Sequence, residues 1–406
     1  MNRALLVACL TAAGTAAAQV QIEQRGFFET RATLYPQTGV NDSGRAVAEA
    51  LLRYEPSVTL APGLKAFGAF DARTDSHRQI ERLWRLDAQD RRRQRPAFSL
   101  RRASLQWHRG PVTLEGGKQF IRWGKADLLN PTDRFAPRDY LSVTDNDFLG
   151  VTAARLTIEK NADTLDLVVT PRFTPSRTPL LNQRWSGVAL PLSLIDEGSR
   201  LPGRTQFGAR WNHTGRGYEF SAVFYDGFHH LPLFEGRLSA TGEAIRLARY
   251  HPRLRLYGGD LAVPTPWATI KAEAAWFGSA TPTADEYAIY VVQAERTRGE
   301  WVFVGGYAGE LVTTRRNPQA FAPDRGFARS FLGRASYSID STRSLAVEAA
   351  IRQSGDGALW KGEYSQQLSS HLRATASFSL IRGATSDFIG QFRRNSHGLL
   401  TLRYSF

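Results

Sequence analysis

Several residue types and patterns are scarce in this sequence. Cys9 is the only cysteine and Met1 the only methionine among 406 residues. Lysine is also rare, since all but six of the 52 basic residues are arginine. No stretch reaches about 18 consecutive apolar residues, which excludes helical membrane spans. If residues 1–18 are removed on export, the mature chain has no cysteine, so disulfides and thiolate metal sites are excluded as well.

The start of the chain predicts export. Arg3 supplies a positive charge, residues 4–18 form an apolar run of small residues, and Ala16-Ala17-Ala18 fits a signal-peptidase site. We therefore expect a signal peptide over 1–18, cleaved after Ala18, and a single domain over 19–406. A lipoprotein box ending at Cys9 is disfavoured, because only about five apolar residues precede it instead of the usual ~7–15. No linker or composition shift divides the rest.

The last strand-like segment has one apolar and one polar face. Side chains alternate along a strand, so Leu400, Leu402, Tyr404 and Phe406 share one face, opposite the polar face that contains Arg403. This pattern suits a strand between lipid and water. The ending resembles the carboxy-terminal signal of bacterial outer-membrane β-barrels, which implies outer-membrane location, contact with lipid and recognition by the barrel-assembly machinery. The residues matching that signal are Leu402, Tyr404 and Phe406.

Alternating segments of this kind recur along the whole chain. Gly, Pro, Asn or Ser turn residues separate them by short connections after every second segment, and longer connections follow the others. The pattern predicts an all-β fold, a transmembrane antiparallel up-and-down barrel of about 18 strands (range 16–18), with short periplasmic turns and long outer loops. A soluble array of β-sandwich domains is the alternative that length alone permits. The expected strands are 22–35, 46–60, 64–75, 97–109, 112–121, 148–160, 163–173, 204–214, 217–227, 251–263, 267–278, 286–297, 300–313, 328–340, 343–354, 359–369, 372–382 and 393–406.

Two details of the barrel follow from the same pattern. The alternation slips near Gly116-Gly117 and Gly258-Gly259, where we expect β-bulges. Nothing before Ile22 is long enough to form a plug domain. A barrel of this size has a lumen too wide for side chains alone to fill, so another segment must narrow it, or the pore is large.

Basic residues exceed acidic ones, 52 against 38, for a net charge of +14. Charged side chains should face the lumen, since each costs roughly 2–4 kcal/mol on the lipid face at mid-depth. For any single arginine, pairing with an acid on a neighbouring strand is a stronger expectation than contact with solute. As a set they favour anionic solutes, because guanidinium groups bind carboxylate and phosphate bidentately. The expected lumen bases are Arg25, Arg31, Arg53, Arg73, Arg102, Arg155, Arg172, Arg210, Arg334, Arg352, Arg373 and Arg403.

The connection at 122–147 is long, dense in charge and broken by two prolines. Aromatic residues and carboxylates among its bases indicate an ordered segment. Two interpretations stay open: the segment bends into the lumen and builds a constriction, or it is an outer loop that braces the rim. The candidates for a constriction are Arg122, Lys125, Asp127, Asp133, Arg134, Arg138 and Asp139.

A longer motif lies across the start of this connection. Gly117-Lys118-Gln119, Trp123-Gly124, Asp127, Asn130-Pro131 and Asp133 resemble the G-[KR]-Q-x-x-x-W-G-x-x-D-x-x-N-P-x-D pattern of a group of porin-like outer-membrane proteins. That group is similar in turn to 18-stranded alginate-export and substrate-selective porins. The resemblance implies a barrel channel. It does not identify the solute.

The sequence gives weaker support for an enzyme or a nucleic-acid-binding protein. No G-x-S-x-G or H-E-x-x-H motif occurs, and the adjacent His229-His230, expected to face solvent, is the one cluster that would suit a barrel hydrolase. No nucleic-acid motif is present, and no cofactor or metal is expected. The run of bases over 91–95 is expected in an outer loop, where it either contacts lipopolysaccharide phosphates or is simply solvated. The leading prediction is a passive channel for small anionic or saccharide solutes, not an enzyme. The alternative is a barrel that binds surface polysaccharide, or takes part in its export, without an open pore.

Overall fold

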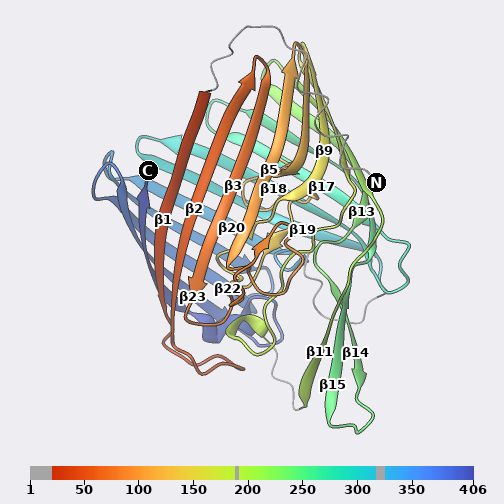
Figure 1. Cartoon of the computed structure of the whole chain (residues 1–406), viewed down its shortest axis with the longest axis vertical. Helices are drawn as coiled ribbons and strands as arrows, with labels where there is room; N and C mark the ends of the chain where they lie inside the picture. Colours follow the sequence, from red (N-terminus) through yellow and green to blue (C-terminus); the bar gives the residue numbers. More distant parts are fainter. Residues whose placement is uncertain (1–20, 188–191, 317–324) are drawn as a thin grey trace, which may run out of the picture.

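The computed structural model describes residues 21–187, 192–316 and 325–406, which form one closed antiparallel barrel (Figure 1). Every expected strand is present, and its ends lie within four residues of the prediction. The predicted signal peptide lies outside the described residues. The barrel strands are β1 (Gln21–Leu34), β2 (Ala46–Ala61), β3 (Leu64–Asp75), β5 (Phe98–Arg109), β6 (Val112–Gln119), β9 (Val151–Lys160), β10 (Asp163–Thr170), β12 (Gln206–Gly215), β13 (Tyr218–Phe228), β16 (Arg253–Pro264), β17 (Thr269–Gly278), β18 (Glu286–Arg298), β19 (Trp301–Thr314), β20 (Ser330–Ser338), β21 (Arg343–Arg352), β22 (Gly357–Gln367), β23 (Leu372–Gly383) and β24 (His397–Ser405).

Each barrel strand pairs with the strand before and after it, and β1 pairs with β24 to close the cylinder. At this seam, Gly26 and Phe406 exchange two backbone hydrogen bonds of 3.0 Å. A Cβ at Gly26 would lie 2.7 Å from the Phe406 ring and 2.5 Å from the carbonyl oxygen of Arg53. The terminal aromatic ring therefore covers a glycine that must stay small. Closure leaves the barrel without a free edge.

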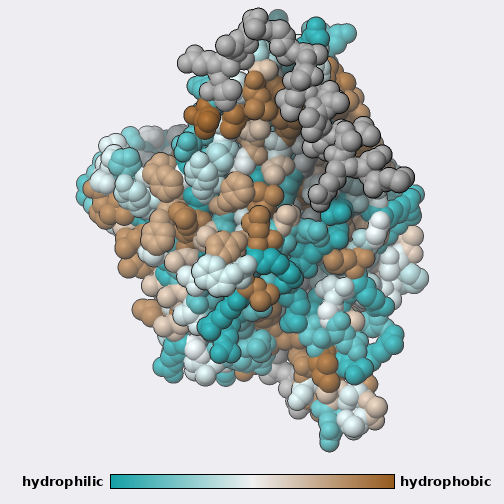
Figure 2. Space-filling model, viewed as in Figure 1, coloured by the Kyte–Doolittle hydropathy of each residue, from teal (hydrophilic) through white to brown (hydrophobic). Residues whose placement is uncertain are grey.

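The wall is apolar outside and polar inside, as the alternation predicts. On β24, Leu400, Leu402 and Tyr404 are exposed, whereas Arg403 points inward and pairs with the buried Glu29 of β1. Figure 2 shows apolar residues gathered over the strand wall and hydrophilic ones towards the loop end. The outward row can be this apolar only if it does not face water, which fits a lipid-exposed surface.

The bulges are not where the glycine pairs suggested. The register runs regularly through Gly116-Gly117 and Gly258-Gly259. Three of these glycines instead allow neighbouring backbones to approach closely. A Cβ would lie 2.2 Å from the carbonyl oxygen of Ala103 at Gly117, 2.6 Å from that of Ala274 at Gly258 and 2.4 Å from that of Ser221 at Gly259. A Cβ at Gly116 would meet no atom within 4 Å. The register shifts between β3 and β5 at Ala69/Phe70, near the β2–β3 turn, and at the start of β18.

The two ends of the barrel differ. Short turns join strands along the upper and left rim of the barrel in Figure 1, and the long connections gather at the lower end. There, β11 (Ser193–Arg200), β15 (Ala244–Tyr250) and β14 (Leu233–Leu238) form a separate small sheet that extends beyond the barrel. Short elements lie within other connections: β4 (Leu86–Asp87), β7 (Arg138–Asp139), β8 (Asp147–Phe148), and the 3₁₀ turns η1 (Arg184–Ser186) and η3 (Gly390–Asn395). Within the described ranges, no helix is long and apolar enough to cross a membrane.

Candidate functional site

The connection between β6 and β9, residues 120–150 and here called the crossing segment, is fixed at its start by one carboxylate. Glu273 of β17 points into the barrel and is 2% exposed. It accepts hydrogen bonds from the backbone amides of Lys125, Ala126 and Thr132, and from the Thr132 hydroxyl at 2.7 Å. A Cβ at Gly124 would lie 2.6 Å from the same carboxylate. The glycine and these three backbone amides together form a cradle for the carboxylate.

Side chains of the motif bind neighbouring parts of the same wall. The Trp123 indole donates to Asp166 of β10 at 2.9 Å. Lys125 pairs with Glu219 of β13 at 2.7 Å. Asp127 accepts hydrogen bonds from Lys271 of β17 and Gln293 of β18. The motif residues that the sequence singled out thus hold the segment against the inner face of β10 to β18.

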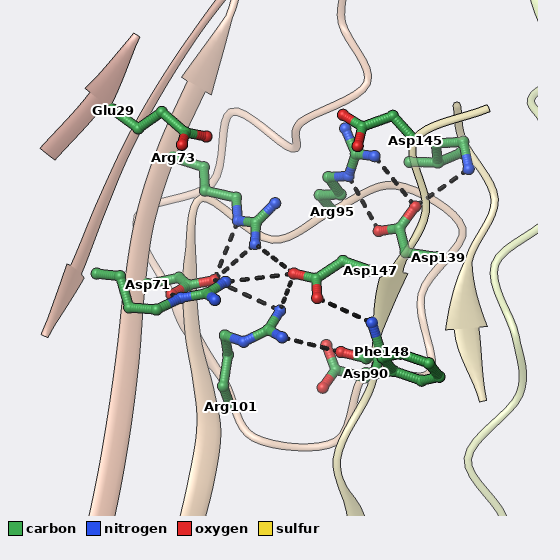
Figure 3. A network of polar contacts seen from close by, with 12 residues as sticks. Glu29, Asp71, Arg73, Asp90, Arg95, Arg101, Asp139, Asp145, Asp147 and Phe148 are labelled. Atoms are coloured by element: carbon green, nitrogen blue, oxygen red, sulfur yellow. Dashed lines mark hydrogen bonds and ion pairs between the residues drawn. The ribbon is translucent and has the colours of Figure 1, made fainter. Parts of the chain in front are cut away.

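The other end of the crossing segment binds arginines of β1 to β5 (Figure 3). Asp147 accepts from Arg101 at 2.8 Å and from Arg53 at 3.3 Å, and lies 3.6 Å from Arg73. Asp145 pairs with Arg31 of β1. Burial opposes ionisation of Asp147, but the positive charges of Arg101, Arg53 and Arg73 outweigh it and hold its pKa at about 2.

These two anchoring regions lie on opposite walls. Around the closed ring of strands, β17 is nine neighbours away from β2 in either direction. A segment bonded to inward-facing residues at both places runs across the lumen. Of the two interpretations drawn from the sequence, the contacts therefore correspond to a segment inside the barrel, and not to one confined to the rim.

Arg101 was not among the expected lumen residues, because strict alternation allows only Arg102 on the inner face. The register shift between β3 and β5 leaves Arg101 opposite no residue and turns both arginines inward. Arg102 pairs with Glu115 at 2.8 Å and lies over the Phe67 ring. The adjacent Arg101-Arg102 pair within an alternating strand was the sequence signal for this bulge.

The middle of the crossing segment is held by two other loops. Asp139 is 3% exposed and accepts from Arg95 of the 76–97 connection and Arg177 of the 171–187 connection, both at 3.0 Å. Asp90 accepts from Arg177 and Lys118 at 2.6 Å each. Burial disfavours the Asp139 anion, yet Arg95 and Arg177 hold its pKa far below the usual range. Arg95 is thus a buried ion-pair partner, which corrects the expectation of a solvated basic run.

Two arginines of the crossing segment share one aromatic ring. The guanidinium carbons of Arg122 and Arg138 lie 3.7 Å and 4.2 Å from the Phe148 ring centre. Arg122 also pairs with Asp133 at 2.5 Å, and burial raises the pKa of Asp133. Arg138 donates to the amide oxygen of Asn146 at 2.9 Å, and no carboxylate within the described ranges accepts a hydrogen bond from it. The backbone carbonyl of Arg134 contacts Nε2 of His230, and the Arg134 guanidinium lies 5.1 Å from the Phe277 ring centre.

The expected lumen arginines are mostly paired. Arg373 contacts Gln367, and Arg172 lies exposed beyond the end of β10. The other expected bases contact carboxylates: Arg25 with Glu55, Arg31 with Glu29, Arg53 and Arg73 with Asp71, Arg102 with Glu115, Arg155 with Asp166, Arg210 with Asp260, Arg334 with Glu348, Arg352 with Asp387, and Arg403 with Glu29.

The histidine cluster does not face solvent as expected. His229 is 7% exposed and stacks near Phe277. Both ring nitrogens of His230 contact backbone carbonyl oxygens, those of Thr174 and Arg134, and its ring stacks on Phe173. These contacts tie loops together.

Solved structures share this fold. The BenF-like porin of Pseudomonas fluorescens Pf-5 matches with a TM-score of 0.54 at 10% identity, over 96% of this chain and 98% of that one. OpdK of Pseudomonas aeruginosa matches at 0.53 and 10%, over 95% and 98%. OpdQ of the same species matches at 0.52 and 13%, over 95% and 97%. The fold is that of an outer-membrane porin barrel. No protein-family model and no curated protein matches the sequence.

Proposed function

We propose that the protein is an outer-membrane channel for small hydrophilic solutes. One observation carries this: a closed barrel, apolar outside and polar inside, whose lumen is crossed by an ordered segment. The likeness to porin barrels supports the same conclusion at the level of the fold. In this proposal the crossing segment forms the constriction, and Arg122, Lys125 and Asp127 lie along the solute's path. Selection then depends on width and charge, without chemistry on the solute.

We further propose that anions, including acidic saccharides, are the preferred solutes. The net charge of +14 supports this, as does Arg138, a cation without a carboxylate partner on the crossing segment. Most wall arginines are neutralised by acids, so the preference depends on the few bases near the constriction and not on the whole wall.

Conductance in planar bilayers tests both statements. The purified protein is expected to give discrete steps, and a salt gradient should give a reversal potential of the sign for anion permeation. Discrete steps with cation preference would contradict the proposed anion preference, while the proposal of a channel would stand. Absence of steps from a folded, heat-modifiable barrel would contradict the channel itself.

A second candidate function is a barrel without an open pore that binds surface polysaccharide. The interlocked charges of Asp90, Asp139 and Arg177 favour it, because three connections are joined where solute would enter. Binding of polysaccharide by a barrel that gives no conductance would support this function.

A further inference from the structure

A cavity outside the crossing segment gathers four arginines at the loop end of the barrel. It has a volume of about 600 Å³ and is lined by the 76–97 connection, by residues of 180–183, and by Ser199 and Leu201 at the end of β11. Its basic lining residues are Arg78, Arg91, Arg92 and Arg93. We propose that this cavity binds a saccharide carrying carboxylate or phosphate groups, at a site separate from the constriction.

The positive charge of the cavity is only partly neutralised within the protein. Glu81 holds Arg92 through two bonds of 2.9 and 3.0 Å. Arg93 lies 2.9 Å from Asp196, but that carboxylate is already bound at both oxygens by Arg249.

The other two arginines form no ion pair with an acid among the described residues. Arg91 donates through Nε to the carbonyl of Phe173, and Arg78 makes no ion pair with any described residue. Burial and the nearby Arg172 lower the pKa of Arg91. The site is thus short of negative charge, which a multivalent anion would supply.

The remaining lining suits a sugar. Leu180 and Leu201 give apolar contact area, while Gln94, Asn182 and Gln183 offer amide groups for hydroxyls. Gln183 is 7% exposed, and its Nε2 donates to the carbonyl of His77 at 3.0 Å. Its Oε1 finds no hydrogen-bond partner among the described residues. The volume is in the usual range for small-ligand sites.

The cavity is preformed by its backbone. Arg78 adopts φ of 58°, a left-handed conformation that non-glycine residues seldom take, and the Gln94 amide holds its carbonyl at 2.7 Å. Backbone amides at Glu81 and Arg95 link the two sides of the same connection. Strain of this kind persists where surrounding contacts impose it, and it clusters at binding sites.

Binding to the detergent-purified protein tests the proposal, with trigalacturonate as the free acidic saccharide and maltotriose as its neutral counterpart. The phosphorylated core oligosaccharide of lipopolysaccharide, with a dephosphorylated sample, forms a second arm. Binding in the first arm identifies a free solute as the source, and binding in the second identifies a neighbouring lipopolysaccharide. The double variant Arg78→Gln/Arg93→Gln should weaken binding at least tenfold. Arg82→Gln, an exposed arginine of the same connection outside the cavity, should leave it within twofold.

A variant that binds more tightly provides a test that a folding defect cannot explain. Glu81→Gln removes the carboxylate that competes for Arg92, so binding should tighten severalfold. If neither acidic ligand binds, if maltotriose binds equally, or if the double variant binds as well as the parent, the proposal is overturned. Conductance is not the readout, so a barrel that does not conduct can still show this site, and failure here leaves the channel proposal standing.

Discussion

Asp139→Asn is the substitution that most directly probes how the crossing segment is held. The carboxylate is buried between Arg95 and Arg177 and also accepts from the amide of Leu141 at 3.1 Å. The asparagine oxygen can keep the bond to Leu141, but the negative charge is lost. Arg95 is then left with Glu49 alone, whose carboxylate lies 3.6 Å away, while Arg177 retains Asp90. Breaking a buried pair in this way costs about 3–5 kcal/mol.

This cost falls on the packing of the loops, because the barrel wall closes without Asp139. At about 1.4 kcal/mol per tenfold change, amides in this region should exchange at least about a hundredfold faster. Two backbone amides are the positions to follow. The Tyr140 amide donates to the Arg177 carbonyl at 3.0 Å, and the Arg177 amide donates to the Arg138 carbonyl at 2.9 Å. Single-channel conductance should rise or become noisy as the segment moves.

The matched control is Asp340→Asn, an acid paired with Arg343 in an exposed turn at the other end of the barrel. It should change neither exchange near Tyr140 nor conductance. The depressed pKa of Asp139 gives a further check. Its stabilisation is fully present above the unfolded value of about 3.9 and is lost only as pH falls through the depressed one, so the parent should behave uniformly from pH 5 to 8. Unchanged exchange in a folded Asp139→Asn barrel would refute the reasoning.

Four other outcomes are expected. Glu273→Gln replaces one accepting oxygen by an NH₂ group, so about 3 kcal/mol of local stability should be lost and proteolysis within 124–132 should appear. Gly26→Val should lower the temperature at which the barrel unfolds on heated gels, because its Cβ would meet the Arg53 carbonyl, whereas Phe406→Leu should have a smaller effect. Burial lowers the pKa of His251 to about 4, so as pH falls below about 6.5 the ring takes up a proton in the unfolded state before it does in the folded state. The packing of residues 229–252 should therefore weaken from pH 6.5 to 4, seen as faster amide hydrogen exchange. The variant His251→Gln should abolish this pH dependence. Arg138→Gln should lower the anion-to-cation permeability ratio by roughly twofold, measured as a reversal potential, and an unchanged ratio would exclude Arg138 from the solute path.

The strand plan could be predicted from the sequence because lipid imposes a local rule. Each outward side chain must be apolar whatever its neighbours are, so alternation along β23 and β24 reveals both strands without knowledge of their partners. The same rule failed at Arg101, where a register shift, which depends on two strands at once, turned a second arginine inward. The expectation of bulges at two glycine pairs was also wrong, because Gly117, Gly258 and Gly259 instead let neighbouring backbones approach.

Loop placement could not be predicted in this way. The sequence showed that residues 122–147 are ordered, because carboxylates and aromatic residues accompany the bases. It could not show that Asp147 would meet Arg101, since a carboxylate binds any guanidinium within reach and this sequence offers many. Nor could it show that Arg95 is buried while Arg91 and Arg93 line a cavity.

The sequence by itself determined an antiparallel barrel with an apolar exterior and a charged interior, because side-chain alternation and turn chemistry are properties of adjacent residues. Only the tertiary structure decided which charges neutralise one another and which stay available. Arg184 donates to the side chain of Asn395, 211 residues away, and Asp127 accepts from Gln293, 166 residues away. Such pairings depend on the diameter and closure of the barrel, which no local pattern specifies.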